Sequence, residues 1–161
     1  MTHARTVAIV RRSLIEVFAD VDGWFERPVD QRTFQPASRG WTIDQVLEHI
    51  SLTNHFLMVT LRKAVEKAVR RAALGQPIPA GESDLQRLEA IGRRGSFLWR
   101  QPEHMEPTGR LATVEVRARL RQQREECLAL LERLNRGEGA LCQLRMSVDA
   151  LGRIDLYQWL Y

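Results

Sequence analysis

The sequence has few cysteines and no long apolar run. Cys127 and Cys142 are the only cysteines among 161 residues, so the chain encodes neither a disulfide framework nor a Cys-x-x-Cys metal site. No apolar run approaches the ~20 residues that a membrane-spanning helix needs, and the N-terminal residues lack the apolar stretch of a signal peptide. We therefore expect a cytoplasmic protein with reduced thiols and no membrane partner.

A strong excess of one charge is also absent. Lys and Arg number 24 against 20 Asp and Glu, which gives a formal net charge of +4. Basic and acidic residues are interleaved along residues 62–67 and 117–126, a pattern typical of solvated helix faces that carry ion pairs. The charge permits contact with nucleic acid, but no helix-turn-helix or aromatic–basic pattern accompanies it. We do not expect a nucleic-acid partner.

Helical periodicity is what the chain has in abundance. Hydrophobic residues make up 44% of the sequence, and a chain of this length buries roughly 70% of its unfolded surface on folding. We expect one domain over residues 1–161. Apolar residues recur at three- and four-residue spacing and predict helices over residues 4–21, 43–73 and 113–136.

The connections between these helices differ in length. Residues 26–40 and 137–152 are predicted to be loops because prolines or glycines interrupt the periodicity. The stretch 75–109 contains four prolines and room for a short helix over 84–91. A connection this long is predicted to be a crossover, which would bring the third long helix parallel to the second.

Residues 40–50 are the most informative segment. Thr42 and Gln45 have the spacing of a capping box, which starts a helix. His49 then stands on a helix face where the periodicity expects apolar residues. Burying an imidazole costs free energy unless its nitrogens find partners, so His49 needs either a hydrogen-bonded niche or a metal. The other members of that face are Val46, Thr53, Phe56 and Thr60.

The neighbours of His49 are interpreted more simply. Glu48 lies about 100° around the helix from His49 and is expected to be a surface charge. Trp41 is expected to pack at the start of the helix. His55 points away from the His49 face and His104 falls in a loop, so both are expected near the surface. Cys127 lies on the apolar side of its helix and is predicted to be inert.

A further helix is expected from Leu156, because Asp155 and Gln158 repeat the capping-box spacing. Only six of its residues precede the end of the sequence at Tyr161, and a helix that short is marginal alone. Its apolar residues indicate an amphipathic element, expected to continue as the fourth helix of a bundle. They are Leu156, Tyr157 and Leu160.

Two stretches resemble the DinB-like family of four-helix-bundle proteins, in the subgroup that includes bacterial thiol-dependent transferases. The first is Ser-Arg-Gly-Trp-Thr at 38–42, followed by Val-Leu-Glu-His-Ile at 46–50. The second is Glu-Pro-Thr-Gly-Arg at 106–110, followed by Leu-Gly-Arg-Ile-Asp-Leu-Tyr-Gln-Trp-Leu at 151–160. Together with the order of the helices, the similarity covers nearly the whole chain.

The resemblance implies an all-α, DinB-like four-helix bundle with a long connection between its second and third helices. In that family a divalent metal, often zinc or nickel, is held by one histidine of the second helix and a His-x-x-x-His pair of the fourth. His49 matches the second-helix ligand. The pair would be expected to follow Tyr161, so the fourth helix is expected to be incomplete within these 161 residues.

The function implied by the resemblance is that of a divalent-metal-dependent hydrolase or thiol S-transferase. Its substrate would be a small molecule, with a low-molecular-weight thiol as a candidate, and the protein would assemble as a homodimer. The alternative is a non-catalytic helical bundle that binds a small molecule or assembles as a dimer. No residue pattern identifies the substrate.

Overall fold

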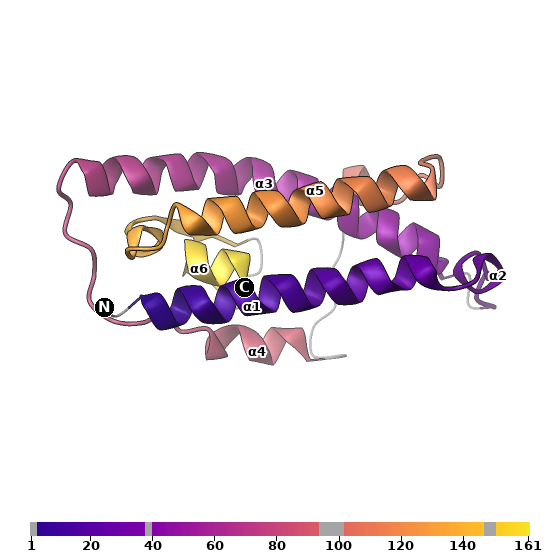
Figure 1. Cartoon of the computed structure of the whole chain (residues 1–161), viewed down its shortest axis with the longest axis horizontal. Coiled ribbons are helices and arrows are strands. Elements are labelled where there is room, and N and C mark those ends of the chain that lie inside the picture. The colour runs from indigo at the N-terminus through magenta and orange to yellow at the C-terminus, as the bar shows by residue number, and fades with distance from the viewer. Residues whose placement is uncertain (1–2, 38–39, 94–101, 147–150) are drawn as a thin grey trace.

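Three long helices form most of the structure. They are α1 (Ala4–Gly23), α3 (Ile43–Ala73) and α5 (Thr113–Glu132), and they run side by side in Figure 1. The short helix α6 (Leu156–Leu160) contacts all three. The computed structural model describes residues 3–37, 40–93, 102–146 and 151–161. The predicted all-α bundle is therefore confirmed.

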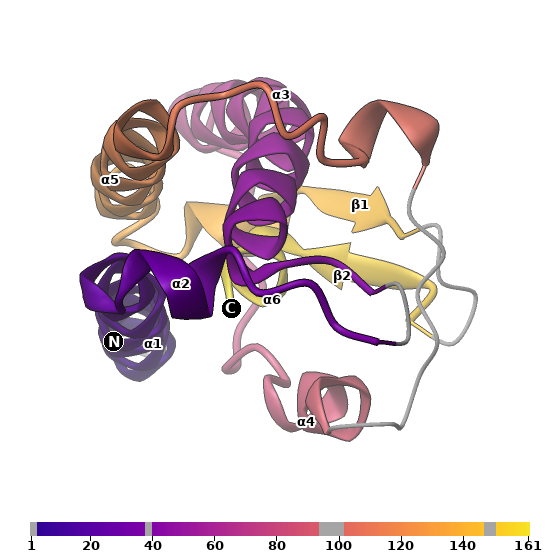
Figure 2. The ribbon, with the colours of Figure 1, turned by 90° about the vertical axis from the view of Figure 1, so that its right-hand side faces the viewer.

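Helices α3 and α5 are parallel, as the long crossover predicts. Asp44 accepts a hydrogen bond from Thr113 near the start of both helices. Further along, Glu66 of α3 pairs with Arg133, directly after α5. The connection from α3 to α5 contains α4 (Gln86–Gly92) and the 3-10 turn η2 (Glu103–Met105). Helix α4 lies apart from the long helices in Figure 2. No helix in the described part of the chain is long and apolar enough to span a membrane.

The segments predicted to be loops contain short elements that the sequence did not reveal. The first holds the end of the 3-10 turn η1 (Trp24–Glu26) and the one-turn helix α2 (Val29–Arg32). The second holds η3 (Glu138–Leu141) and the strand β1 (Gln143–Arg145), which pairs antiparallel with β2 (Arg153–Asp155) directly after this loop. Strands of three residues are too short for alternation to be recognised, so pairing rather than pattern defines them.

The main core lies where the apolar faces of α1, α3 and α5 meet α6. Burying each such aliphatic side chain contributes about 1.5–3 kcal/mol relative to exposure. The helix boundaries predicted from these apolar stripes are close to those observed, although α5 ends four residues earlier than predicted. The fully buried members include Val10, Leu61, Val65, Leu131, Leu134, Leu156 and Tyr157, each no more than 2% exposed.

Both predicted capping boxes are present. At the start of α3, the backbone N–H of Gln45 donates to Thr42 Oγ1 at 3.2 Å, and the N–H of Thr42 donates to Gln45 Oε1 at 2.9 Å. At the start of α6, Asp155 and Gln158 exchange the same two bonds, each 2.9 Å long. Each box satisfies backbone donors that a helix leaves unpaired, so it fixes where the helix begins.

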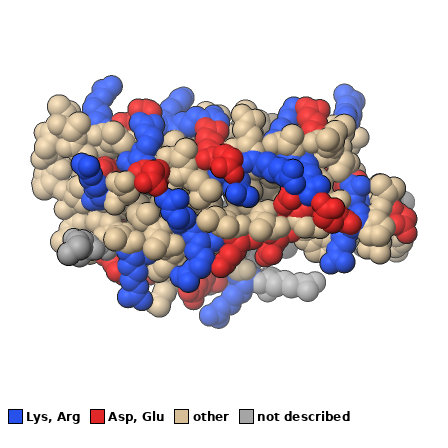
Figure 3. Space-filling view, viewed as in Figure 1, with Lys and Arg blue, Asp and Glu red and all other residues tan. Residues whose placement is uncertain are grey.

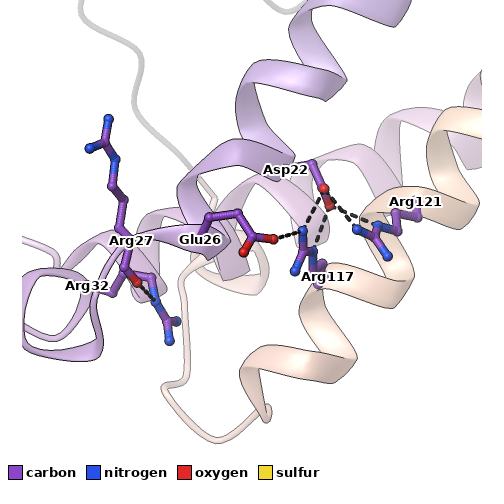
Figure 4. Close-up of polar contacts among 6 residues, drawn as sticks. All are labelled: Asp22, Glu26, Arg27, Arg32, Arg117 and Arg121. Carbon is purple, nitrogen blue, oxygen red and sulfur yellow. Dashed lines mark hydrogen bonds and ion pairs between the residues drawn. The ribbon is translucent and has the colours of Figure 1, made fainter.

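Ion pairs between α1 and α5 join the two helices at one end (Figure 4). Asp22 accepts bidentate bonds from Arg117, at 2.8 and 2.9 Å, and from Arg121, both at 2.9 Å. Arg117 also pairs with Glu26 at 2.5 Å. These hydrogen bonds and charges hold the pKa of the Asp22 carboxyl well below its usual range. Asp22 therefore favours the folded state in its ionised form.

This arrangement predicts a pH-dependent effect of Asp22→Asn. Because the pKa of Asp22 is lower in the folded chain, its contribution is present above the unfolded-state pKa of about 4 and is lost as pH falls. The variant should melt at a lower temperature than wild type at pH 7, and the difference should shrink steadily below about pH 4. Circular dichroism melts from pH 7 to pH 2 measure it. Asp20→Asn, at an exposed position of α1, is the control and should show no such trend.

Tyr157 holds α6 against the end of α5. Its ring is fully buried, and its hydroxyl donates to the backbone carbonyl of Leu134 at 2.5 Å. A Cβ added to Gly139 would come within 2.6 Å of this ring, so a side chain at that position would displace it. Burial raises the pKa of Tyr157 well above its usual range, so the hydroxyl stays protonated at neutral pH and remains a donor.

Removing this hydroxyl should destabilise the bundle. Tyr157→Phe leaves the Leu134 carbonyl without its donor in a buried site, which costs about 1–3 kcal/mol. Urea unfolding followed by circular dichroism measures the loss. Tyr161→Phe removes the same group from an exposed ring and should leave the free energy of unfolding unchanged. Equal effects of the two substitutions would contradict the role assigned to Tyr157.

Candidate functional site

His49 stands near the start of α3 with its ring half-buried. Its Nδ1 lies 2.7 Å from the backbone carbonyl oxygen of Met105, in η2. A carbonyl oxygen can only accept, so Nδ1 carries the hydrogen and donates it. In a neutral imidazole the lone pair is then on Nε2. The contact thus selects one tautomer of His49.

Trp41 packs against this imidazole. The two ring centroids are 4.8 Å apart and the ring planes are inclined by 49°. Trp41 lies just before the capping residue Thr42, so the turn that starts α3 also places the indole. The expectation that Trp41 is a packing residue is met, with His49 as a partner. Between Trp41 and Met105, the imidazole is held in position.

The helix face predicted around His49 is not the face that meets the core. Val46 and Phe56 on that face are 40% and 37% exposed. The buried stripe of α3 lies beside this face. Apolar residues occur on both adjoining stripes, so the local sequence has no signal that distinguishes the buried one. His49 therefore stands at the edge of the core. The buried residues of the core-facing stripe include Leu47, Ser51, Met58, Leu61 and Val65.

Glu48 was expected to be a surface charge, and this prediction is wrong. The residue is only 2% exposed. Its Oε1 accepts from the backbone N–H and the hydroxyl of Thr108, at 3.0 and 2.7 Å, and its Oε2 accepts from the N–H of Gly109 at 2.8 Å. Three donors compensate for the desolvation of the carboxylate. They come from a segment 60 residues away, so the local pattern could not reveal them.

Asp44 ties the same end of α3 to two other segments. Its Oδ1 accepts from Nη1 of the buried Arg32 at 2.5 Å, and its Oδ2 accepts from the hydroxyl of Thr113 at 3.4 Å. A cavity of about 310 Å³ lies beside Asp44 and Glu48. The first turns of α3 therefore hold η2, the loop after it and the start of α5 together.

The other histidines do not join His49. His55 and His104 are both exposed, as expected, and each contacts Phe56 edge-on, with centroid separations of 5.2 and 4.4 Å. His3 is buried, with Nε2 3.1 Å from the carbonyl of Pro79. Within the described ranges, no three His, Cys, Asp or Glu side chains gather as a metal site.

The cysteines are buried and do not form a nucleophilic site. Burial raises the pKa of the Cys127 thiol to about 11, so it stays protonated at neutral pH. Cys142, which was expected in a loop, follows η3 and is only 4% exposed. The predicted inertness of Cys127 agrees with this environment.

Comparison with protein families identifies the fold. The family model of the DinB superfamily matches residues 7–160. The chain belongs to the DinB superfamily. No curated protein and no solved structure matched it. The match extends from α1 to the last residue of α6, so it includes Trp41, Glu48 and His49, and it confirms the resemblance seen in the sequence.

The buried carboxylate of Glu48 should be essential to this end of the DinB-superfamily bundle. Glu48→Gln replaces one acceptor oxygen by an NH₂ group that faces a backbone donor, so we expect a loss of about 1–3 kcal/mol in the free energy of unfolding. Chemical denaturation measures it. Glu125→Gln, at an exposed position of α5, is the matched control. If both variants unfold alike, the hydrogen bonds to Thr108 and Gly109 do not hold the loop.

Proposed function

We propose that this chain is a divalent-metal-dependent hydrolase or thiol S-transferase of the DinB superfamily, with His49 as a metal ligand. The observation that carries the proposal is the contact between Nδ1 of His49 and the Met105 carbonyl. Histidines that bind metals commonly donate their other ring N–H to a carbonyl or carboxylate, which fixes the tautomer. In His49 this contact makes Nε2 the nitrogen available to a metal.

Three residues of the chain orient His49 in this proposal. Met105 fixes the tautomer, and Trp41 limits rotation of the ring. Glu48 acts indirectly, because it binds Thr108 and Gly109, which follow η2 within four residues of Met105. Two adjacent residues of α3 therefore have linked roles: His49 is the proposed metal ligand, and Glu48 holds the segment that orients it.

The described residues supply one protein ligand, and a catalytic zinc site uses three together with an open position. They do not form a complete site, so no catalytic step is assigned through a metal. A bound zinc or nickel ion would act as a Lewis acid or would activate water or a low-molecular-weight thiol. The chain's own residues hold one imidazole in a fixed orientation.

The second candidate is a non-catalytic bundle that binds a small apolar molecule or forms a dimer. It is favoured by a groove of about 240 Å³ between α1 and α3, with the end of α6 beside it. Val17 and Leu57, on opposite sides of this groove, are 59% and 37% exposed. The groove is lined mainly by apolar side chains, among them Phe18, Ile50, Met58 and Trp159.

Metal binding separates the two candidates. The 161-residue chain is purified without chelator, its zinc and nickel content is measured, and Zn²⁺ affinity is determined by calorimetry. The first candidate predicts that His49→Ala weakens Zn²⁺ binding about tenfold or more. His55→Ala removes an exposed histidine of the same helix and should leave the affinity unchanged.

A second measurement does not depend on tightly bound metal. Nitrogen NMR of the His49 ring should show a proton on Nδ1, and added Zn²⁺ should shift the Nε2 resonance. If Zn²⁺ leaves His49 unaffected, or if both histidine variants bind it as wild type does, the metal-dependent function is wrong. The non-catalytic bundle then stands as the function.

A further inference from the structure

A second polar site lies between α3 and α5, away from His49. It is a cleft of about 380 Å³, and His49 is not among the residues that line it. One stripe of each helix forms its walls: positions 51, 55, 58 and 62 of α3, and positions 119, 122, 123 and 126 of α5. Such three- and four-residue spacings place side chains on one helix face. His104 of η2 lines the cleft as well.

Gln123 provides a buried acceptor without a partner in this cleft. The residue is 9% exposed, and its Nε2 donates to the backbone carbonyl of Ser51 at 2.8 Å. A carbonyl can only accept, so this bond fixes which end of the amide is nitrogen. Oε1 is then left buried with no hydrogen-bond partner. A buried unpaired acceptor is unfavourable, so the site favours a ligand that brings a donor.

Aromatic rings form a wall of the same cleft. Phe56 lies between two imidazoles, with its ring edge-on to His104 at 73° and to His55 at 82°. Phe56 is 37% exposed, so its ring is accessible to a ligand. Aromatic rings pack against other rings in offset-stacked or edge-to-face arrangements. This wall favours an aromatic ligand over an aliphatic one.

The guanidinium groups of the lining favour a carboxylate. Arg62 and Arg119 both line the cleft, together with the carboxylate of Glu126. Arg62 pairs with Glu126 through Nε and Nη2. Arg119 uses Nη2 on Glu115 at 2.6 Å and is exposed, so its other N–H groups can bind a carboxylate.

The spacing of these groups defines the ligand. Arg119 and Gln123 are four residues apart on α5, so their side chains are about one helical turn, 5–6 Å, from each other. We propose that this cleft binds a small aromatic carboxylate with a ring N–H. The carboxylate binds Arg119, the ring packs against Phe56 and His104, and the N–H donates to Gln123 Oε1. Because Oε1 is shielded from solvent, the ligand needs a path to reach it. In this proposal the exposed side chains of Arg119 and Gln122 move aside when the ligand enters.

Three related probes test this assignment. Indole-3-carboxylate has the ring, the carboxylate and the N–H; 1-methylindole-3-carboxylate lacks the donor; indole lacks the carboxylate. Each is titrated into the isotope-labelled 161-residue chain and followed by proton–nitrogen NMR. We expect saturable shifts at residues of the cleft for the first probe, and about tenfold weaker binding for each of the others.

Variants locate the two polar contacts. Arg119→Gln should weaken indole-3-carboxylate about tenfold. Arg133→Gln removes the same charge from an exposed arginine beyond α5, which also pairs with a glutamate, and should change nothing. Gln123→Met keeps the approximate shape of the side chain but removes Oε1, so the difference between the N–H and N-methyl probes should disappear.

The proposal fails if indole-3-carboxylate gives no saturable shift at millimolar concentration. It also fails if the N-methyl probe binds wild type equally well, or if Arg119→Gln and Arg133→Gln weaken binding to the same extent. The last result would mean that net charge, rather than the cleft, attracts the anion. A circular dichroism melt of Gln123→Met establishes that this variant is folded before its affinities are compared.

Discussion

The burial of the Glu48 carboxylate is the constraint on which the His49 end of the molecule depends. A charge at 2% exposure is tolerated only because two backbone N–H groups and one hydroxyl converge on it. These donors belong to the loop between η2 and α5. Once they are in place, the carbonyl of Met105 is within reach of the adjacent His49. The buried Glu48 thus helps to position the Met105 carbonyl, which is the hydrogen-bond partner of His49.

The remaining stability of the fold comes from helix packing and from a few well-placed polar contacts. α1, α3 and α5 bury their apolar faces together, and Tyr157 anchors α6 to the end of α5. Outside the core, basic and acidic side chains are interspersed over the face shown in Figure 3. Many of them form pairs between helices, such as Asp22 with Arg117 and Arg121. The interleaved charge pattern therefore serves pairing between helices as well as solvation.

Two polar regions share the η2 turn but differ in chemistry. The His49 region holds an imidazole that contacts an indole and a carbonyl, an arrangement suited to a metal or to a hydrogen-bond donor. The cleft lined by Gln123 carries guanidinium groups, which suit a carboxylate, and an unpaired amide oxygen, which suits a hydrogen-bond donor. The turn η2 takes part in both regions, because its Met105 accepts from His49 and its His104 lines the cleft.

Local patterns were enough to predict the parts of this protein that depend on neighbouring residues. The capping boxes at Thr42 and Asp155 and the extents of α1 and α3 follow from contacts within one or two helical turns, so they were predicted correctly. Membership of the DinB superfamily was also recognisable, because its motifs around His49 and Tyr157 are short and contiguous.

Tertiary contacts decided the rest. Glu48 is buried and His49 has a defined tautomer because of partners 60 and 56 residues away. The stripe of α3 that meets the core is set by where α5 and α6 lie. The strands β1 and β2 exist only through their pairing. Hydrogen-bond partners that are distant in sequence leave no periodic signal, so only the folded chain assigns them.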